Sequence, residues 1–215
     1  MCARSWGPTE VDKFTRIDAV ALPVAQPNVD TDQIIPARFL WHPRSDGYGQ
    51  WLFNDLRFAE DGSTKPGFVL NKPQYAAARV VVAERNFGCG SSREQAVWAL
   101  YDYGFRVVIA PSFGDIFYNN SFKQGLLPVV LPEAEVAALR EAIERGNSAE
   151  VSVDLERQTV SGPGGFVARF EIAPFRKQKL LEGLDDIAMT LALADEINAF
   201  ETTFDRDMPW LAPTA

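Results

Sequence analysis

A glycine-rich loop carries the residues with the clearest chemical potential: Gly88-Cys89-Gly90-Ser91-Ser92-Arg93-Glu94. It lies between an expected buried strand and an expected helix, where doubly wound sheets bind ligands. Free N–H groups at a helix start favour anions, glycines let a ligand approach the backbone, and Arg93 can hold a carboxylate in bidentate fashion. The loop therefore predicts an anion site. The alternative is a plain helix start that Ser92 caps.

A second polar segment, Asp30-Thr31-Asp32, is followed by Arg38 and Arg44. Alone, such a segment is often a turn in which side chains bond the backbone. If it faces the glycine-rich loop, the two together would combine serine, carboxylate and arginine. That combination suits a small di- or tricarboxylate.

Several catalytic motifs are absent from the glycine-rich loop. A phosphate-binding P-loop needs Gly-Lys-Ser/Thr, and the dinucleotide fingerprint needs a third glycine where Arg93 stands. Neither serine has the glycine two residues later that a lipase-type elbow requires. Any Ser/His or Cys/His apparatus would have to use His42, the only histidine, which we expect in a surface loop. Cys2 and Cys89 with one histidine cannot build a structural zinc or iron–sulfur site.

The elements expected to position these loops alternate between strands and helices. Hydrophobic runs predict strands at residues 18–24, 79–83, 106–110 and 127–131, and helices at 93–103, 113–123 and 132–145. Alternation at 151–155, 158–161 and 166–172 predicts an antiparallel ribbon, before helices at 174–182 and 185–204. Residues 28–32 read as a loop, and residues 41–66 as an irregular segment with a short helix near 51–58. The class is α/β, with a parallel or mixed sheet, an added antiparallel β ribbon and C-terminal helices.

Composition limits the protein class. With 215 residues, 47% hydrophobic and 23% charged, the chain fits a soluble globular protein. We expect one domain over 1–215, with an N-terminal extension at 1–16 and an acidic helical tail at 182–215. No apolar run approaches a membrane span, and the N-terminus does not resemble a secretory signal. Two cysteines favour a reducing cytoplasm.

The net charge of −8 argues against nucleic-acid and anionic-membrane partners. Eight acidic residues and one basic residue lie between residues 182 and 215, so this tail carries −7 of that charge. The remaining body is nearly neutral. The tail is interpreted as a solvated helix face, with a docking surface as the alternative.

Several motifs in register resemble the small-subunit family of 3-isopropylmalate dehydratase (isopropylmalate isomerase), in the aconitase superfamily. The similarity covers roughly residues 17–200. The matching stretches are Asn28-Val29-Asp30-Thr31-Asp32-Gln33-Ile34-Ile35-Pro36, Leu52-Phe53-Asn54-Asp55, Asn86-Phe87 with the glycine-rich loop, Ala110-Pro111-Ser112-Phe113-Gly114-Asp115-Ile116-Phe117, Asn119-Asn120-Ser121-Phe122, Leu126-Leu127-Pro128-Val129 and Gly183-Leu184-Asp185-Asp186-Ile187.

This resemblance implies a swivel-type β/β/α domain that docks, in a heterodimer, onto a large subunit that holds a [4Fe–4S] cluster. The implied reaction is reversible dehydration and rehydration, which takes 2-isopropylmalate to 3-isopropylmalate through isopropylmaleate in leucine biosynthesis. A dehydration also needs a Lewis acid for hydroxide departure. This chain offers no ligand set for one, so we expect the metal on the partner.

The resemblance assigns roles within the glycine-rich loop. Ser91 matches the base that removes a proton from carbon, and Ser92 and Arg93 match residues that support it and bind substrate carboxylate. This assignment agrees with the physical argument. A serine base needs its alkoxide stabilised, and a helix N-terminus with an adjacent arginine does so.

The first motif supplies the other implied site residues. Asp32 matches the active-site aspartate. A basic residue that follows helps to bind substrate, and Arg38 and Arg44 are both candidates. Residues 39–42, Phe-Leu-Trp-His, match the region that discriminates the γ-substituent of the substrate.

Three residues depart from the family pattern. Gln95 and Gln178 stand where histidines are frequent, and Ala188 stands where glycine is usual. The serine base and its arginine are kept, so the departures bear on the substrate's side group. The alternatives are a paralogue acting on another 2-hydroxy diacid, such as methyl- or dimethylmalate, and a non-catalytic binding module that kept the fold.

Overall fold

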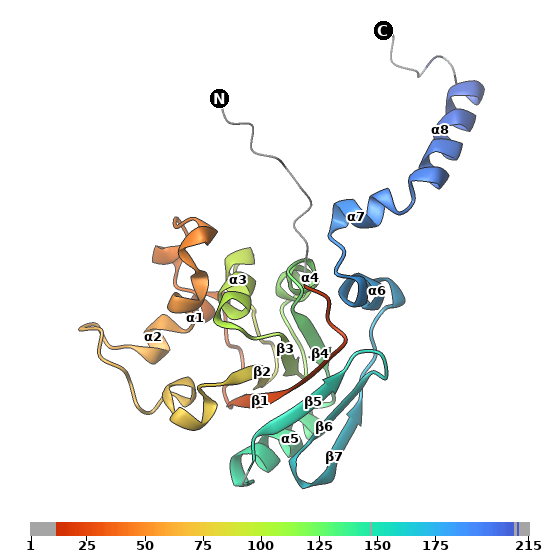
Figure 1. Ribbon diagram of the computed structural model, residues 1–215. Helices are drawn as coiled ribbons and strands as arrows, with labels where there is room; N and C mark the ends of the chain where they lie inside the picture. The colour runs from red at the N-terminus through yellow and green to blue at the C-terminus, as the bar shows by residue number, and fades with distance from the viewer. Residues whose placement is uncertain (1–11, 147, 209, 211–215) are drawn as a thin grey trace.

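One seven-stranded mixed sheet forms the body of the molecule (Figure 1). The computed structural model describes residues 12–146, 148–208 and 210. The strands lie in the order β4-β3-β2-β1-β5-β6-β7. Their bounds are β1 Arg16–Val24, β2 Ala78–Ala83, β3 Val107–Ala110, β4 Leu127–Val130, β5 Glu150–Asp154, β6 Thr159–Gly162 and β7 Phe166–Arg169.

Strand β1 is where the sheet changes from parallel to antiparallel pairing. It pairs in parallel with β2 and antiparallel with β5. Strands β2, β3 and β4 continue the parallel half, and β5, β6 and β7 form the antiparallel half. The predicted α/β class with an antiparallel ribbon is therefore confirmed.

Burial explains why the two halves have different sequences. Every residue of β3 is buried, as is every residue of β2 except Arg79, because helices cover both faces. Residues of β5 alternate between buried and partly exposed, as expected for a strand with one face toward the core.

Helices cover the parallel half of the sheet on both sides. Figure 1 shows α3 (Glu94–Tyr103) and α4 (Asp115–Lys123) on one side and α5 (Glu133–Arg145) on the other. Helix α3 ends at Gly104 in the left-handed conformation, as the sequence predicts. Within the irregular segment 41–66, α2 (Asn54–Arg57) is the short helix expected near 51–58.

Two segments differ from the sequence prediction. Residues 28–32, predicted as a loop, run into a single helical turn, α1 (Thr31–Ile34), which the Asp30 side chain caps by accepting from the Gln33 N–H at 2.8 Å. The C-terminal helices are α6 (Pro174–Glu182), α7 (Asp186–Leu191) and α8 (Ala194–Asp207). The region predicted as helical over 185–204 is therefore broken at residues 192–193.

Much of the predicted N-terminal extension, and the end of the predicted tail, lie outside the described residues. Residue 12 is the first described residue of the 1–16 extension, and β1 begins at Arg16. Among the helices of the described chain, none is both long enough and apolar enough to cross a bilayer.

Gly88 holds the glycine-rich loop against α4. Its φ of +71° is a left-handed conformation, and a Cβ at this position would overlap the Phe117 ring. Gly62 has a similar φ of +81°, but a Cβ there would have nothing within 4 Å. The two glycines thus share a backbone constraint and differ in packing.

We expect Gly88→Ala to lower the free energy of unfolding by about 2–4 kcal/mol, because backbone strain adds to overpacking. Gly62→Ala, the matched control, should lose only the backbone part, about 1–2 kcal/mol. Urea denaturation of both variants measures the difference. Equal losses would contradict a packing role for Gly88.

Candidate functional site

The loops that follow β1 and β2 meet at the carboxyl ends of these strands. Gly88 N–H donates to the Val29 carbonyl at 2.7 Å, and Thr31 N–H donates to the Cys89 carbonyl at 2.9 Å. The buried Thr31 hydroxyl also donates to the Ser91 carbonyl at 3.0 Å. The two polar segments singled out in the sequence therefore form one backbone-linked site.

An ion pair between Asp32 and Arg93 joins the two loops through their side chains. Both Nη atoms of Arg93 donate to the Asp32 carboxylate, the Nη2–Oδ2 bond measuring 2.8 Å. Arg93 is 14% exposed, whereas Asp32 is 55% exposed. The hydrogen bond from Arg93 lowers the pKa of Asp32, and the Ala37 N–H contributes in the same direction. Asp32 is thus held as a carboxylate beside a largely covered guanidinium.

Ser91 and Ser92 are both exposed at the start of α3. The N-cap residue of α3 is Arg93, and no side chain caps this helix start within the described chain. The alternative in which Ser92 caps the helix is therefore wrong. An uncapped helix start leaves N–H groups available to an anion beside the two hydroxyls.

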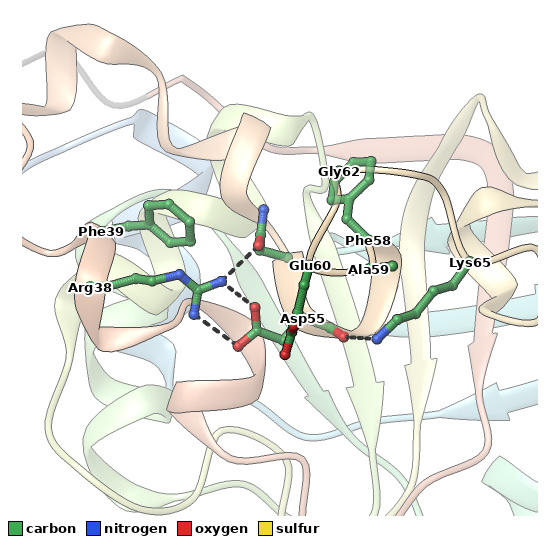
Figure 2. Close-up of a pocket in the computed structure, with 9 residues that line it drawn as sticks. Arg38, Phe39, Asp55, Phe58, Ala59, Glu60, Gly62 and Lys65 are labelled. Carbon is green, nitrogen blue, oxygen red and sulfur yellow. Dashed lines mark hydrogen bonds and ion pairs between the residues drawn. The ribbon is translucent and has the colours of Figure 1, made fainter.

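Arg38 lines an open pocket of about 760 Å³ (Figure 2). It donates to both carboxylate oxygens of Asp55, with Nη1–Oδ2 at 2.9 Å, and to the Asn54 side-chain oxygen at 2.9 Å. Lys65 lines the same pocket and donates to the Asp55 carbonyl at 2.8 Å. Arg38 stays 53% exposed and its hydrogen bonds lower the pKa of Asp55. An oriented, accessible guanidinium thus faces an open cavity.

Arg44 points to different neighbours along α3 and α4. It donates to Gln124 at 2.5 Å and to Asp102 at 3.2 Å, and its guanidinium lies 5.1 Å from the Trp98 ring centroid. Gln124 in turn donates to Glu94 at 2.6 Å, in the first turn of α3. Arg44 therefore reaches the loop site only indirectly.

The segment 39–42 forms an aromatic stack. The His42 ring lies 3.8 Å from that of Trp41 and 4.3 Å from that of Trp51, which also stacks on Phe39. His42 is in a loop, as predicted, but its side chain is only 22% exposed and contacts Asp46 at 3.0 Å. Trp41 is 77% exposed, so the stack ends in an open apolar surface.

Cys89 is the one free cysteine of the described chain. Burial raises the pKa of its thiol, and the neighbouring Asp30 acts in the same direction. Among the described residues, no group of three or more His, Cys, Asp or Glu side chains is arranged to hold a metal ion.

Sequence reasoning gives no role to Thr31 as a link between loops, or to Asn54 and Asp55 as holders of Arg38. The signals for both are present in the motifs. Thr31 lies between two acidic residues in the first motif, and the polar pair ends an otherwise apolar stretch, Leu52-Phe53-Asn54-Asp55. Their partners lie 60 and 16–17 residues away, so spacing alone could not identify them.

The sheet and its paired loops define a swivel-type β/β/α domain of the aconitase class. The family model described as "Aconitase C-terminal domain" matches residues 11–134. Two further models match the remainder: "LeuD_N" matches residues 137–174, and the model of the C-terminal domain of 3-isopropylmalate dehydratase small subunits matches residues 186–214.

Relatives named "3-isopropylmalate dehydratase small subunit" match nearly the whole chain. Those from Paramagnetospirillum magneticum and Jannaschia sp. are 52% and 53% identical, over 94% of this chain and 100% of theirs. The crystal structure of 3-isopropylmalate dehydratase from Methanocaldococcus jannaschii matches with a TM-score of 0.62 and 27% identity, over 86% of this chain and 99% of that one. The chain belongs to the family of 3-isopropylmalate dehydratase small subunits.

The Asp32–Arg93 pair predicts a specific pH dependence. Because the folded pKa of Asp32 is lowered, the pair stabilises the fold above the ordinary carboxyl pKa of about 3.9. That stability is lost as pH falls through the lower, folded value. It should amount to less than about 1 kcal/mol, because Asp32 is more than half exposed.

In an NMR titration, Arg93→Gln should raise the midpoint of Asp32 toward the ordinary value. Arg16→Gln is the matched control, since Arg16 lowers the pKa of Asp18 in the same manner on β1. It should shift Asp18 and leave Asp32 unchanged. An Asp32 midpoint that Arg93→Gln does not move would refute the pairing.

Proposed function

We propose that this chain is the small subunit of a heteromeric hydro-lyase that converts 2-isopropylmalate to 3-isopropylmalate through isopropylmaleate, in leucine biosynthesis. The observation that carries the proposal is the junction of the two loops, where an Asp32–Arg93 pair lies beside exposed serines at an uncapped helix start. Family membership supports the reaction, because the relatives are named as small subunits of 3-isopropylmalate dehydratase. The enzyme would act in the cytoplasm.

In this proposal, Ser91 is the base that takes the carbon-bound proton. A serine hydroxyl is a weak base unless its alkoxide is stabilised. The free N–H groups at the start of α3 and the nearby guanidinium supply that stabilisation. On rehydration, the same oxygen returns the proton to carbon, so the reaction runs in either direction.

The substrate's carboxylates would be bound by cationic and hydroxyl groups around the loop junction. Arg93 and Ser92 would take one carboxylate, with Asp32 fixing the orientation of the Arg93 guanidinium. Both candidate arginines are held by a carboxylate and an amide side chain, Arg38 by Asp55 and Asn54 and Arg44 by Asp102 and Gln124. Arg38 is the better candidate for a further contact because it also lines the open pocket. The exposed end of the aromatic stack, Trp41, would face the substrate's apolar side group.

The partner would be an iron–sulfur large subunit, whose [4Fe–4S] cluster would supply the Lewis acid for hydroxide departure. The chain described here would supply the base and the carboxylate-binding groups. Names shared with relatives at 50–53% identity favour isopropylmalate over another 2-hydroxy diacid. The same names favour a part of an enzyme over a non-catalytic binding module.

The decisive experiment replaces the proposed base. In the complex with the large subunit, Ser91→Ala should lower kcat by at least about a thousandfold, because it removes the proposed base. Ser161→Ala, in β6 of the antiparallel half, is the matched control and should leave kcat unchanged. Assembly is checked by gel filtration. Full turnover by an assembled Ser91→Ala complex would overturn the proposal.

A second pair of variants separates the two candidate arginines. Arg38→Lys should lower kcat/KM by about tenfold to a hundredfold, mainly through KM, because lysine cannot make a bidentate contact with a carboxylate. Arg44→Lys keeps the charge beside Asp102 and should change kcat/KM by less than about threefold. Steady-state kinetics on isopropylmalate measures both. The reverse ranking would assign the substrate contact to Arg44.

A further inference from the structure

The C-terminal helices α7 and α8 form an arm, residues 186–208, that extends away from the sheet (Figure 1). No residue of the arm is buried. At its base, the buried ammonium group of Lys179, in α6, pairs with Asp186. The arm is therefore anchored at one end, and its side chains are left uncovered by the described body.

Most of the exposed large apolar side chains of the described chain lie on this arm or just beyond it. They are Ile187, Leu191, Leu193, Ile197, Phe200, Met208 and Trp210, seven of the twelve such residues. Such a concentration on a surface marks an interaction site.

Four of these residues, together with the partly exposed Phe204, form one stripe along α8 and its two flanking positions. Leu193, Ile197, Phe200, Phe204 and Met208 follow one another at spacings of four, three, four and four residues, which places them on one face of a helix. At 3.6 residues per turn, Glu196 and Asp207 border one side of the stripe, and Glu201 and Asp205 border the other. The stripe thus has an apolar centre and an acidic rim on both sides.

The charge of the arm limits which surfaces could cover the apolar stripe. Each arm holds six acidic residues and one basic residue, a net charge of −5, so two arms packed against each other would repel. The chain's own body leaves the stripe uncovered in the structure. A complementary surface is an apolar groove bordered by lysine and arginine on a different protein.

We infer that the arm docks into such a groove on the large subunit of the same enzyme, which rests on the proposed function. The family comparison supports this partner, because the arm coincides with a segment described as the C-terminal domain of a dehydratase small subunit. Relatives with that name match 94% of this chain, so their matched region includes most of the arm. The arm would hold the two subunits together while the loop site faces the substrate.

The test compares full-length chains that differ on opposite faces of α8. Ile197→Ser/Phe200→Ser removes the centre of the stripe, and Asn198→Ser/Thr202→Ser changes the opposite face. Each chain is titrated calorimetrically into the large subunit purified with its cluster. The stripe variant should raise Kd by about 30-fold or more, because buried aromatic anchors dominate interfaces. The control should stay within about twofold. Both variants should keep the wild-type Tm.

The acidic rim gives an independent readout. Wild-type Kd should rise with ionic strength, and Glu196→Gln/Glu201→Gln should flatten that dependence. An unchanged Kd for the stripe variant, or no complex with wild type, overturns the inference. A homodimer that the stripe variant disrupts would assign the arm to a second copy. A lower Tm for the stripe variant would show that the stripe packs against the body of its own chain.

The two proposals fail in different ways. An arm-dependent complex without isopropylmalate turnover would overturn the proposed reaction and leave the docking inference standing. Turnover of isopropylmalate by a complex whose Kd does not depend on the stripe would overturn the docking inference and leave the proposed reaction standing.

Discussion

The parallel pairing of β1 with β2 is the constraint on which the site depends. It sets the register from Ala21 opposite Val80 to Val24 opposite Ala83, so that the loops after both strands leave the sheet at the same edge. The pairing continues beyond the strands as a parallel bridge between Asp30 and Cys89. With the backbones fixed in this way, Asp32 and Arg93, 61 residues apart in sequence, can form a bidentate pair.

The largely covered guanidinium of Arg93 explains the composition of the loop junction. A cation with 14% of its side chain exposed needs a counter-charge, and Asp32 provides one from the more exposed side. In the proposed complex, a substrate carboxylate would use the remaining N–H donors of this guanidinium, whose orientation Asp32 already fixes. The backbone of Ser91 is fixed relative to α1 because the Thr31 hydroxyl donates to the Ser91 carbonyl. Positioning and charge balance are thus achieved by the same few bonds.

The sequence predicts what local physics decides. The hydrophobic run of β2, the glycine-rich turn and the periodicity of α3 are short-range patterns, and the structure places each where the sequence indicates. The helical turn of α1 is not predicted, because its polar residues favour caps and turns equally. The partners of Arg38 and Arg44 depend on how 41–66 folds over α3, a region without periodicity. Those contacts are decided by tertiary packing between segments far apart in the sequence, and no local pattern in the sequence predicts them.

The distribution of charge connects the site with the arm. An enzyme of dianionic substrates gains nothing from negative potential near its carboxylate-binding groups, because like charges slow association and weaken binding. Here the excess acid lies in the last 34 residues, on helices that extend from the sheet (Figure 1). The body that holds Ser91 and Arg93 is left nearly neutral. Acid concentrated beside an apolar stripe can guide a basic-rimmed partner without opposing the substrate, because α8 extends away from the sheet whose loops form the junction (Figure 1).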